Sequence, residues 1–240
     1  MRELEPGDPQ RLGDHEVLGV LGTGGFGRVY IARAPHGKWL AVKLLHPQLM
    51  RAAPDLPERF AAVMGDLTRV RNLGAGRIVQ WDADDIRPWY ARRHVPGASL
   101  LDVLAVCGAL PQAAGRIVAG VARGLAAMHD AELPHGAVSP GNVLLTTTTA
   151  QLVDGGLLRM FDPGAPLLGA GLAAPEEPDG TRAADIYALG ALLVLCVRGR
   201  LPSGPKDVDE LPERLATVAT ALLDPDPASR PTAAETAAEL

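Results

Sequence analysis

The stretch Gly22-Thr-Gly-Gly-Phe-Gly-Arg-Val29 is the most informative part of this 240-residue sequence, and it fits the pattern G-x-G-x-x-G-x-V. Dinucleotide-binding folds share the first half of this pattern, but they open a helix after the last glycine. Here the chain continues as Arg28-Val-Tyr-Ile-Ala, whose β-branched and aromatic residues favour a strand. We therefore expect a glycine loop between two strands, with bare backbone amides that can approach a triphosphate.

Further motifs follow the glycine loop in a fixed order. Ala41-Val-Lys43 lies on the next predicted strand, sixteen residues after the last loop glycine. His135-Gly-Ala-Val-Ser-Pro-Gly-Asn142, Asp154-Gly-Gly and Ala174-Pro-Glu176 have the spacing of the motifs H-R-D-L-x-x-x-N, D-F-G and A-P-E. By these residues the chain resembles the eukaryotic-like bacterial Ser/Thr protein kinases of actinobacterial type, as a degenerate member (a pseudokinase), over roughly residues 11–240.

The resemblance implies an α+β, bilobal protein-kinase-like fold in one domain. A small β-rich N-lobe with the glycine loop, the lysine strand and one main helix would cover residues 11–95, and a larger, mostly helical C-lobe would cover residues 96–240. The residue patterns agree, since short strands with turns fill the first third and apolar residues recur every three to four positions later. The patterns predict helices over residues 54–71, 112–131, 185–197, 211–223 and 231–240, a hairpin over residues 143–154 and a loop over residues 200–211.

The resemblance also implies ATP and Mg²⁺ as ligands. The residues that match the family's nucleotide site are Leu21, Gly22, Gly24, Gly27, Val29, Ala41, Lys43 and Leu144. Asn142 and Asp154 match its Mg²⁺ ligands, and their oxygens suit this cation. Without the resemblance, Lys43 reads as an exposed strand lysine, and Asn142 and Asp154 read as turn-capping residues. Four further residues match structural positions: His135 at the start of its loop, Asp185 as a cap on that loop, and Glu176 and Arg230 as a buried ion pair.

The groups that transfer a phosphoryl group in the family are missing from their positions. The catalytic aspartate falls on Ala137, and a methyl group can neither accept a proton nor orient a hydroxyl group. Such positioning contributes about 10²–10⁴-fold in rate, or roughly 3–5 kcal/mol of barrier. The lysine that would neutralise the transferring group is Ser139, and residues 135–145 contain no Asp or Glu. We therefore expect no catalytic residue here.

The main helix of the small lobe departs from the family pattern as well. Val63 replaces the glutamate that pairs with the strand lysine, and Asp66, nearly one turn later, would reach Lys43 only if the helix shifts. The phenylalanine of D-F-G is replaced by Gly155. We therefore expect a hole where an aromatic ring would pack, and flexibility at Gly155-Gly156.

The segment from Gly155 to Ala173 contains no Ser, Thr or Tyr, so phosphorylation cannot order it. The arginine that would receive such a phosphate is replaced by Gly136. Both the phosphorylation site and the arginine that would bind its phosphate are therefore missing.

Arg92 falls at the position beside the adenine pocket when residues are counted back from Val95-Pro-Gly97. A guanidinium group at this position would obstruct ATP or recruit a different anion, unless Arg92 points to solvent. The sequence leaves these three alternatives open.

Composition excludes several classes of protein. The chain is 47% hydrophobic and 21% charged, which is typical of a globular protein. Its net charge of −5 argues against binding of nucleic acid through bulk positive charge. Cys107 and Cys196 lie far apart with no His/Cys cluster near either, which fits a reducing cytoplasm. The longest apolar run, Ile186–Val197, is too short to cross a bilayer, so we expect no membrane segment.

These observations predict a cytoplasmic pseudokinase that binds a protein partner, either an active kinase or another signalling protein, as a regulator or scaffold. One alternative is an atypical, weakly active Ser/Thr protein kinase that transfers the ATP γ-phosphoryl group to protein hydroxyls. A second alternative is an interaction module that binds no nucleotide. An ATP titration separates the second alternative from the other two.

Overall fold

The computed structural model describes residues 1–83, 87–161, 172, 174–176, 181–203 and 206–240. The chain divides into two compact units. Among these residues, the first unit holds 1–71, 75–95 and 159–161, and the second holds 72–74, 96–158 and those from 172 onward.

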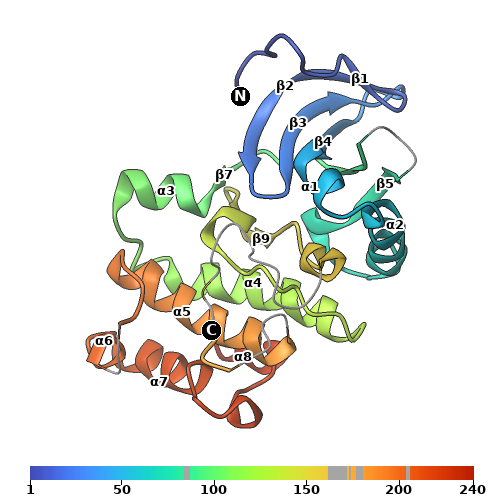
Figure 1. The fold of residues 1–240 in the computed structure, drawn as a ribbon. Helices are drawn as coiled ribbons and strands as arrows, with labels where there is room; N and C mark the ends of the chain where they lie inside the picture. Colours follow the sequence, from blue (N-terminus) through green and yellow to red (C-terminus); the bar gives the residue numbers. More distant parts are fainter. Residues whose placement is uncertain (84–86, 162–171, 173, 177–180, 204–205) are drawn as a thin grey trace. The chain divides into compact units, whose positions relative to one another are not determined.

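The first unit is built on a six-stranded antiparallel sheet in the order β1-β2-β3-β4-β6-β5 (Figure 1). One face of this sheet buries an apolar core that includes Tyr30, Val42 and Trp89. Because side chains alternate along a strand, Ala41 and Lys43 lie on the opposite face. The strands are β1 (Arg11–Leu12), β2 (His15–Gly24), β3 (Gly27–Arg33), β4 (Trp39–Leu45), β5 (Ile78–Asp82) and β6 (Trp89–Arg93).

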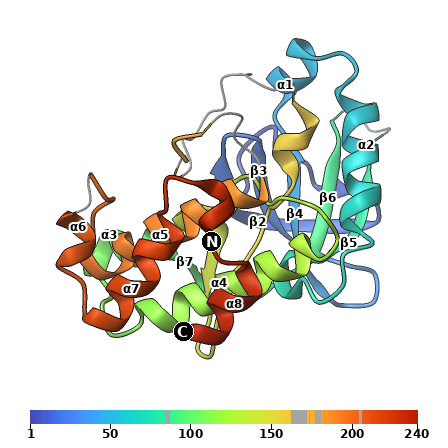
Figure 2. The same cartoon turned by 90° about the horizontal axis from the view of Figure 1, so that it is seen from below.

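Two helices, α1 (Pro47–Ala52) and α2 (Leu56–Leu67), follow β4. The apolar residues of α2 recur every three to four positions and form one buried face, where the Phe60 ring meets Trp81 of β5 edge to face with ring centroids 6.2 Å apart. Figure 2 shows α2 running beside β5. The predicted helix over residues 54–71 is thus present but shorter, and α1 was not predicted.

The second unit is mostly helical. Its core is centred on α4 (Ala114–His129) and α5 (Arg182–Arg198), with α8 (Ala233–Glu239) and β9 packed on α4 and α7 (Glu213–Leu222) packed on α5. A small antiparallel sheet in the order β7-β8-β9 completes it. The remaining elements are β7 (Ala98–Ser99), α3 (Leu100–Cys107), η2 (Pro140–Asn142), β8 (Val143–Leu145), β9 (Ala150–Leu152), α6 (Lys206–Asp209) and η4 (Pro227–Ser229); η1 (Gly74–Gly76) and η3 (Leu157–Met160) each span both units.

The predictions for the later helices and for the hairpin over residues 143–154 are confirmed to within about one turn. The loop predicted over residues 200–211 is wrong in part, because it contains the helical turn α6. The Asp207 carboxylate anchors this turn by accepting hydrogen bonds from the Ser203 backbone and hydroxyl and by pairing with Arg200 at 2.7 Å.

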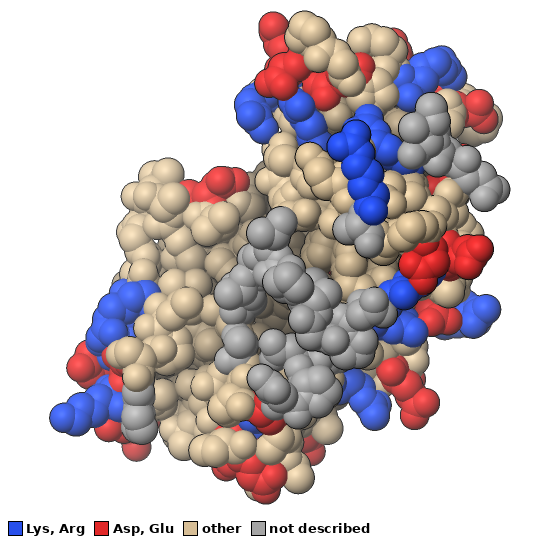
Figure 3. All heavy atoms as spheres, in the orientation of Figure 1, with Lys and Arg blue, Asp and Glu red and all other residues tan. Residues whose placement is uncertain are grey.

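Within the described part of the chain, no helix has both the length and the apolar character needed to cross a membrane. On the face drawn in Figure 3, Lys and Arg lie among Asp and Glu and do not gather in a basic patch.

Candidate functional site

The glycine loop joins β2 and β3 as a tight hairpin, as the sequence predicts. Gly24 pairs with Gly27 across the two strands, and Gly25-Phe26 forms the turn. A Cβ atom at Gly27 would lie 2.2 Å from the carbonyl oxygen of Leu44, so the close approach of β4 requires glycine there. A Cβ atom at Gly22 or Gly24 would meet no atom within 4 Å. These two glycines therefore leave the backbone bare beside open space, which is what a cradle for phosphate oxygens requires.

The register of the sheet brings the other nucleotide-site residues of the first unit to one face. Val29 pairs with Lys43 across β3 and β4, and Ala41 lies two residues before Lys43 on β4. Lys43 is 6% exposed and Ala41 is 2% exposed. The interpretation of Lys43 as a solvent-exposed strand lysine is therefore wrong. Leu21, at the start of the loop, is more than one third exposed.

Arg92 lies directly opposite Ala41 on β6 and is only 6% exposed. Directly opposed residues of antiparallel strands share a face, so the guanidinium group lies on the face that carries Ala41 and Lys43. The alternative in which Arg92 points to solvent is therefore wrong. Burial lowers the pKa of the neighbouring His94, and the positive charge of Arg92 lowers it further.

Asn142 and Asp154, the candidate Mg²⁺ ligands, are tied together through the backbone of the second unit. The Asn142 side-chain amide donates to the carbonyl oxygen of Ala137 at 2.8 Å, and the N–H group of Val153 donates to the Asn142 carbonyl oxygen at 2.9 Å. Asp154 adopts a left-handed backbone with φ +63°, which few residues other than glycine adopt. Leu144 lies partly buried on β8, two residues after Asn142.

Two oxygen ligands suit a Mg²⁺ ion that keeps its waters and arrives with substrate phosphates. Among the residues that the structure describes, no group of three His, Cys, Asp or Glu side chains gathers to hold a metal without such help. The donor set therefore fits a metal bound together with a nucleotide.

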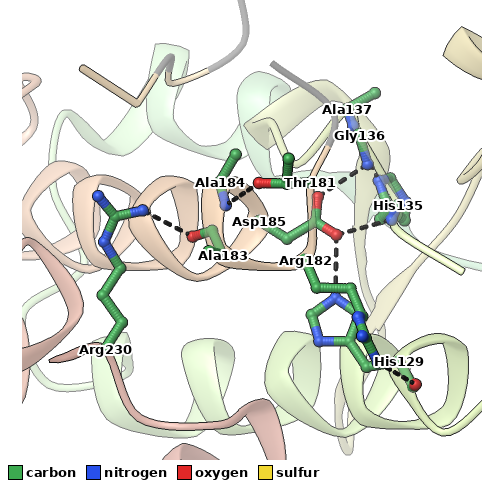
Figure 4. A network of polar contacts seen from close by, with 10 residues as sticks. All are labelled: His129, His135, Gly136, Ala137, Thr181, Arg182, Ala183, Ala184, Asp185 and Arg230. Carbon is green, nitrogen blue, oxygen red and sulfur yellow. Dashed lines mark hydrogen bonds and ion pairs between the residues drawn. The ribbon is translucent and has the colours of Figure 1, made fainter. Parts of the chain in front are cut away.

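Asp185, at the start of α5, holds the His135 loop in place (Figure 4). Its carboxylate is 2% exposed and accepts hydrogen bonds from the backbone N–H groups of His135 at 2.7 Å and Gly136 at 2.8 Å, and from Nε2 of His129 at 2.9 Å. His135 is itself buried: its Nε2 donates to the carbonyl oxygen of Val153 and its Nδ1 accepts from the N–H group of Ala137. Burial lowers the pKa of His135, consistent with this neutral tautomer.

Arg230 forms a second anchor in the same unit. It donates to both carboxylate oxygens of Glu176, with one contact at 2.8 Å, and to the carbonyl oxygens of Ala183 and Asp224. The hydrogen bonds from Arg230 lower the pKa of Glu176. The cap by Asp185 and the pair between Glu176 and Arg230 are both present in the geometry that the sequence predicts.

The space around Gly155 and Gly136 differs from the sequence expectation. A Cβ atom at Gly155 would lie 2.4 Å from Cδ2 of His135 and 2.8 Å from Sδ of Met128. The predicted hole is therefore wrong, because these two side chains fill it. Gly136 has φ +72°, and a Cβ atom there would touch the Leu158 side chain. An arginine at this position would start from a strained backbone.

Val63 and Asp66 take different roles on α2. Val63 is 4% exposed within the apolar face of the helix. Asp66 Oδ2 accepts a hydrogen bond from the guanidinium group of Arg159 at 2.7 Å, so Asp66 does not take the pairing with Lys43 that a shifted helix would allow. The sequence analysis missed Arg159, because no local spacing connects residues that lie 93 positions apart.

A scan against protein families matches residues 15–239 to the protein kinase domain. Similar curated proteins include the serine/threonine-protein kinase AfsK of Streptomyces coelicolor, 30% identical over 99% of this chain, and the serine/threonine-protein kinase PknD of Mycobacterium tuberculosis, 32% identical over 95% of it. The chain spans 33% and 35% of the length of these relatives. Among solved structures, the PknI kinase domain of Mycobacterium tuberculosis matches with a TM-score of 0.75 and 25% identity over 95% of each chain.

Proposed function

The chain belongs to the protein kinase family, and from this premise we propose that it is a pseudokinase, which binds ATP with Mg²⁺ and does not transfer the γ-phosphoryl group. The observation that carries the proposal is Ala137, which stands where the family's catalytic aspartate belongs. Catalysis of phosphoryl transfer consists of positioning and electrostatic stabilisation, so loss of the group that orients the hydroxyl removes a main contribution.

Several further residues support the loss of transfer. Ser139 replaces the lysine that would neutralise the transferring group, and Val63 replaces the glutamate that would orient Lys43. Gly136 and Gly155 replace two more residues of the family motifs. A Cβ atom at Gly155 would meet the His135 and Met128 side chains, which argues that glycine at this position is built into the packing.

Retention of ATP is supported by the residues that would bind it. The open space over Gly22 and Gly24 leaves room for phosphate oxygens, and Lys43 supplies a positive charge on the same sheet face as Val29 and Ala41. Asn142 and Asp154 would hold Mg²⁺, which in this family neutralises the charge of the β- and γ-phosphates. With Ala137 at the transfer position, these residues bind and orient a nucleotide that is not consumed.

A kinase-fold protein that does not transfer the phosphoryl group acts by binding. We therefore infer that it binds another protein. We assign it the role of a cytoplasmic regulator or scaffold for an active kinase or another signalling protein. The mixed charge on the face drawn in Figure 3 and the net charge of −5 argue against a nucleic-acid partner.

The first test is thermal unfolding of the purified chain with and without ATP and Mg²⁺. A ligand present at about 100 times its dissociation constant stabilises the folded state by roughly 2.7 kcal/mol, which raises the midpoint measurably. We expect a magnesium-dependent rise that is lost in Lys43→Ala and Asp154→Ala and kept in Lys38→Ala, which removes an exposed lysine before the same strand. No rise at millimolar ATP would favour the interaction module that binds no nucleotide.

The retained Lys43, Asn142 and Asp154 also favour a second candidate, a weakly active Ser/Thr kinase. Incubation with γ-labelled ATP and a generic protein acceptor separates the two. The pseudokinase gives no label above the Asp154→Ala background. Label that appears with the native chain and disappears in Asp154→Ala would show that the chain is a kinase.

A further inference from the structure

A pocket of about 320 Å³ lies in the second unit, where the end of α4, the start of α5 and the segment from η4 to the start of α8 meet. This volume is at the lower end of the range for small-molecule sites, so the pocket suits a ligand the size of a free amino acid. Among the described residues that line it, none belongs to the candidate nucleotide site. Apolar residues from all three segments line much of the pocket, among them Ala126, Ile186, Pro231 and Ala233.

Five of the described lining residues are polar or charged, and three of them already use their side chains within the fold. Arg230 donates to both carboxylate oxygens of Glu176. The His129 ring is hydrogen-bonded to Asp185, and Thr232 caps α8. The remaining two residues carry opposite charges, and they are therefore the groups that can bind a ligand in the pocket.

These two residues are Arg182 and Asp130, and each lies at a helix end whose dipole opposes its charge. Arg182 is the first residue of α5, where the partial charge of the helix is positive. Asp130 is the C-cap residue of α4, where the partial charge is negative. Residues that break a local rule in this way are expected at functional sites. A ligand with a carboxylate beside Arg182 and a cation beside Asp130 would match both side chains and both helix dipoles.

The Arg182 guanidinium group is held only loosely by the protein. Among the described residues, its hydrogen-bond partner is the carbonyl oxygen of His129 at 3.4 Å, which is longer than a usual hydrogen bond (Figure 4). A guanidinium group has five N–H donors and binds a carboxylate through two of them at once. Arg182 therefore retains the donors that a carboxylate ligand needs.

We propose that this pocket binds a free α-amino acid with an aliphatic side chain. Arg182 binds its carboxylate, Asp130 binds its ammonium group, and the apolar lining receives its side chain. Each charged group of the ligand then has a partner of opposite charge, and burial of the aliphatic side chain adds to the affinity. This binding goes beyond the proposed function, and it holds whether or not the chain binds ATP.

Isothermal titration calorimetry of the purified chain with L-leucine tests the proposal. We expect Arg182→Gln and Asp130→Asn each to weaken binding about tenfold or more, because each variant removes a charge-assisted hydrogen bond. Arg123→Gln is the matched control, since it removes an exposed arginine of α4 that does not line the pocket, and it should bind as the native chain does. Absence of binding at millimolar L-leucine, or native affinity in both pocket variants, would overturn the proposal.

Analogues of the ligand separate the two charged contacts. L-leucinamide lacks the carboxylate and N-acetyl-L-leucine lacks the ammonium group, so we expect each to bind about tenfold or more weakly than L-leucine. Equal binding of N-acetyl-L-leucine and L-leucine would contradict the assignment to a free amino acid.

Hydrogen exchange and a pocket-filling variant test where L-leucine binds. We expect L-leucine to slow exchange at the backbone amides of residues 126–130 and 182–186. Ala234→Leu places a larger side chain at an exposed position in the wall of the pocket, so it should abolish binding without lowering the midpoint of thermal unfolding. Protection confined to other segments, or native affinity in Ala234→Leu, would contradict binding in this pocket.

Discussion

Two neighbouring regions of the second unit differ in their side chains: one carries buried charged groups, and the other lacks polar side chains. Around Asp185 and Arg230, buried charged groups are matched by hydrogen-bond partners from backbone and side chains (Figure 4). Gly136 and Ala137, whose backbone N–H groups belong to this network, and Gly155 carry no polar side chain. The first region fixes the loop on which the second lies. The side chains that hold the loop are therefore kept, while the positions where the family carries its transfer groups contribute only backbone.

Among the variants considered, removal of the Asp185 carboxylate should lower the free energy of unfolding most. In Asp185→Ala, the N–H groups of His135 and Gly136 lose their acceptor inside the protein. Each orphaned buried donor costs about 1–3 kcal/mol, so we expect the free energy of unfolding to fall by roughly 2–6 kcal/mol. Urea denaturation followed by circular dichroism measures this change.

The matched control for this variant is Asp102→Ala. Asp102 is an exposed aspartate in the first turn of α3, where it accepts a hydrogen bond from Ser99. Its loss should cost less than about 1 kcal/mol. Similar losses for the two variants would contradict the view that the buried cap holds the His135 loop.

The next effect concerns the space at Gly155. In Gly155→Ala, the new methyl group would meet the buried His135 ring and Met128, so we expect the free energy of unfolding to fall by about 1–3 kcal/mol. Gly141→Ala is the matched control, because the nearest atom to a Cβ there lies 3.9 Å away, and we expect it to stay within about 0.5 kcal/mol of the native chain. Thermal or urea unfolding measures both. A neutral Gly155→Ala variant would show that His135 can move aside and that the site can admit a larger side chain.

The fold was largely predictable from the sequence, whereas the packing around the candidate site was not. The glycine hairpin and the amphipathic α2 follow from local patterns of strand formers and from spacings of three and four. The filled space at Gly155 and the burial of Arg92 depend on residues that approach only in the folded chain. The pairing of Asp66 with Arg159 crosses 93 positions, and no local pattern encodes such a partner. Periodicity predicts which face of an element is buried, and it does not predict which side chain fills a given gap.

The smallest expected effect is a dependence of the free energy of unfolding on pH that originates in the region around Asp185 and Arg230. Burial lowers the pKa of His135 below the ordinary 6.5, so at neutral pH the ring is neutral in both the folded and the unfolded chain. As the pH falls through 6.5, the unfolded chain binds a proton that the folded chain does not. The free energy of unfolding should therefore decrease as the pH falls, by at most about 1.4 kcal/mol per pH unit for this group. Glu176, whose pKa is also lowered, adds a loss of the same sign below its ordinary value of 4.5.

Urea unfolding at a series of pH values between 7.5 and 5.5 isolates the histidine contribution. His94 acts in the same direction, because burial and Arg92 lower its pKa as well. We expect the His94→Gln variant to keep most of the slope and the His135→Gln variant to lose most of it, whatever its absolute stability. If His135→Gln kept the native slope, the proton-linked stability would lie outside the network around Asp185. The dependence of stability on pH would then not originate in the hydrogen-bond network around Asp185, and it would not distinguish this network from the positions of the missing transfer groups.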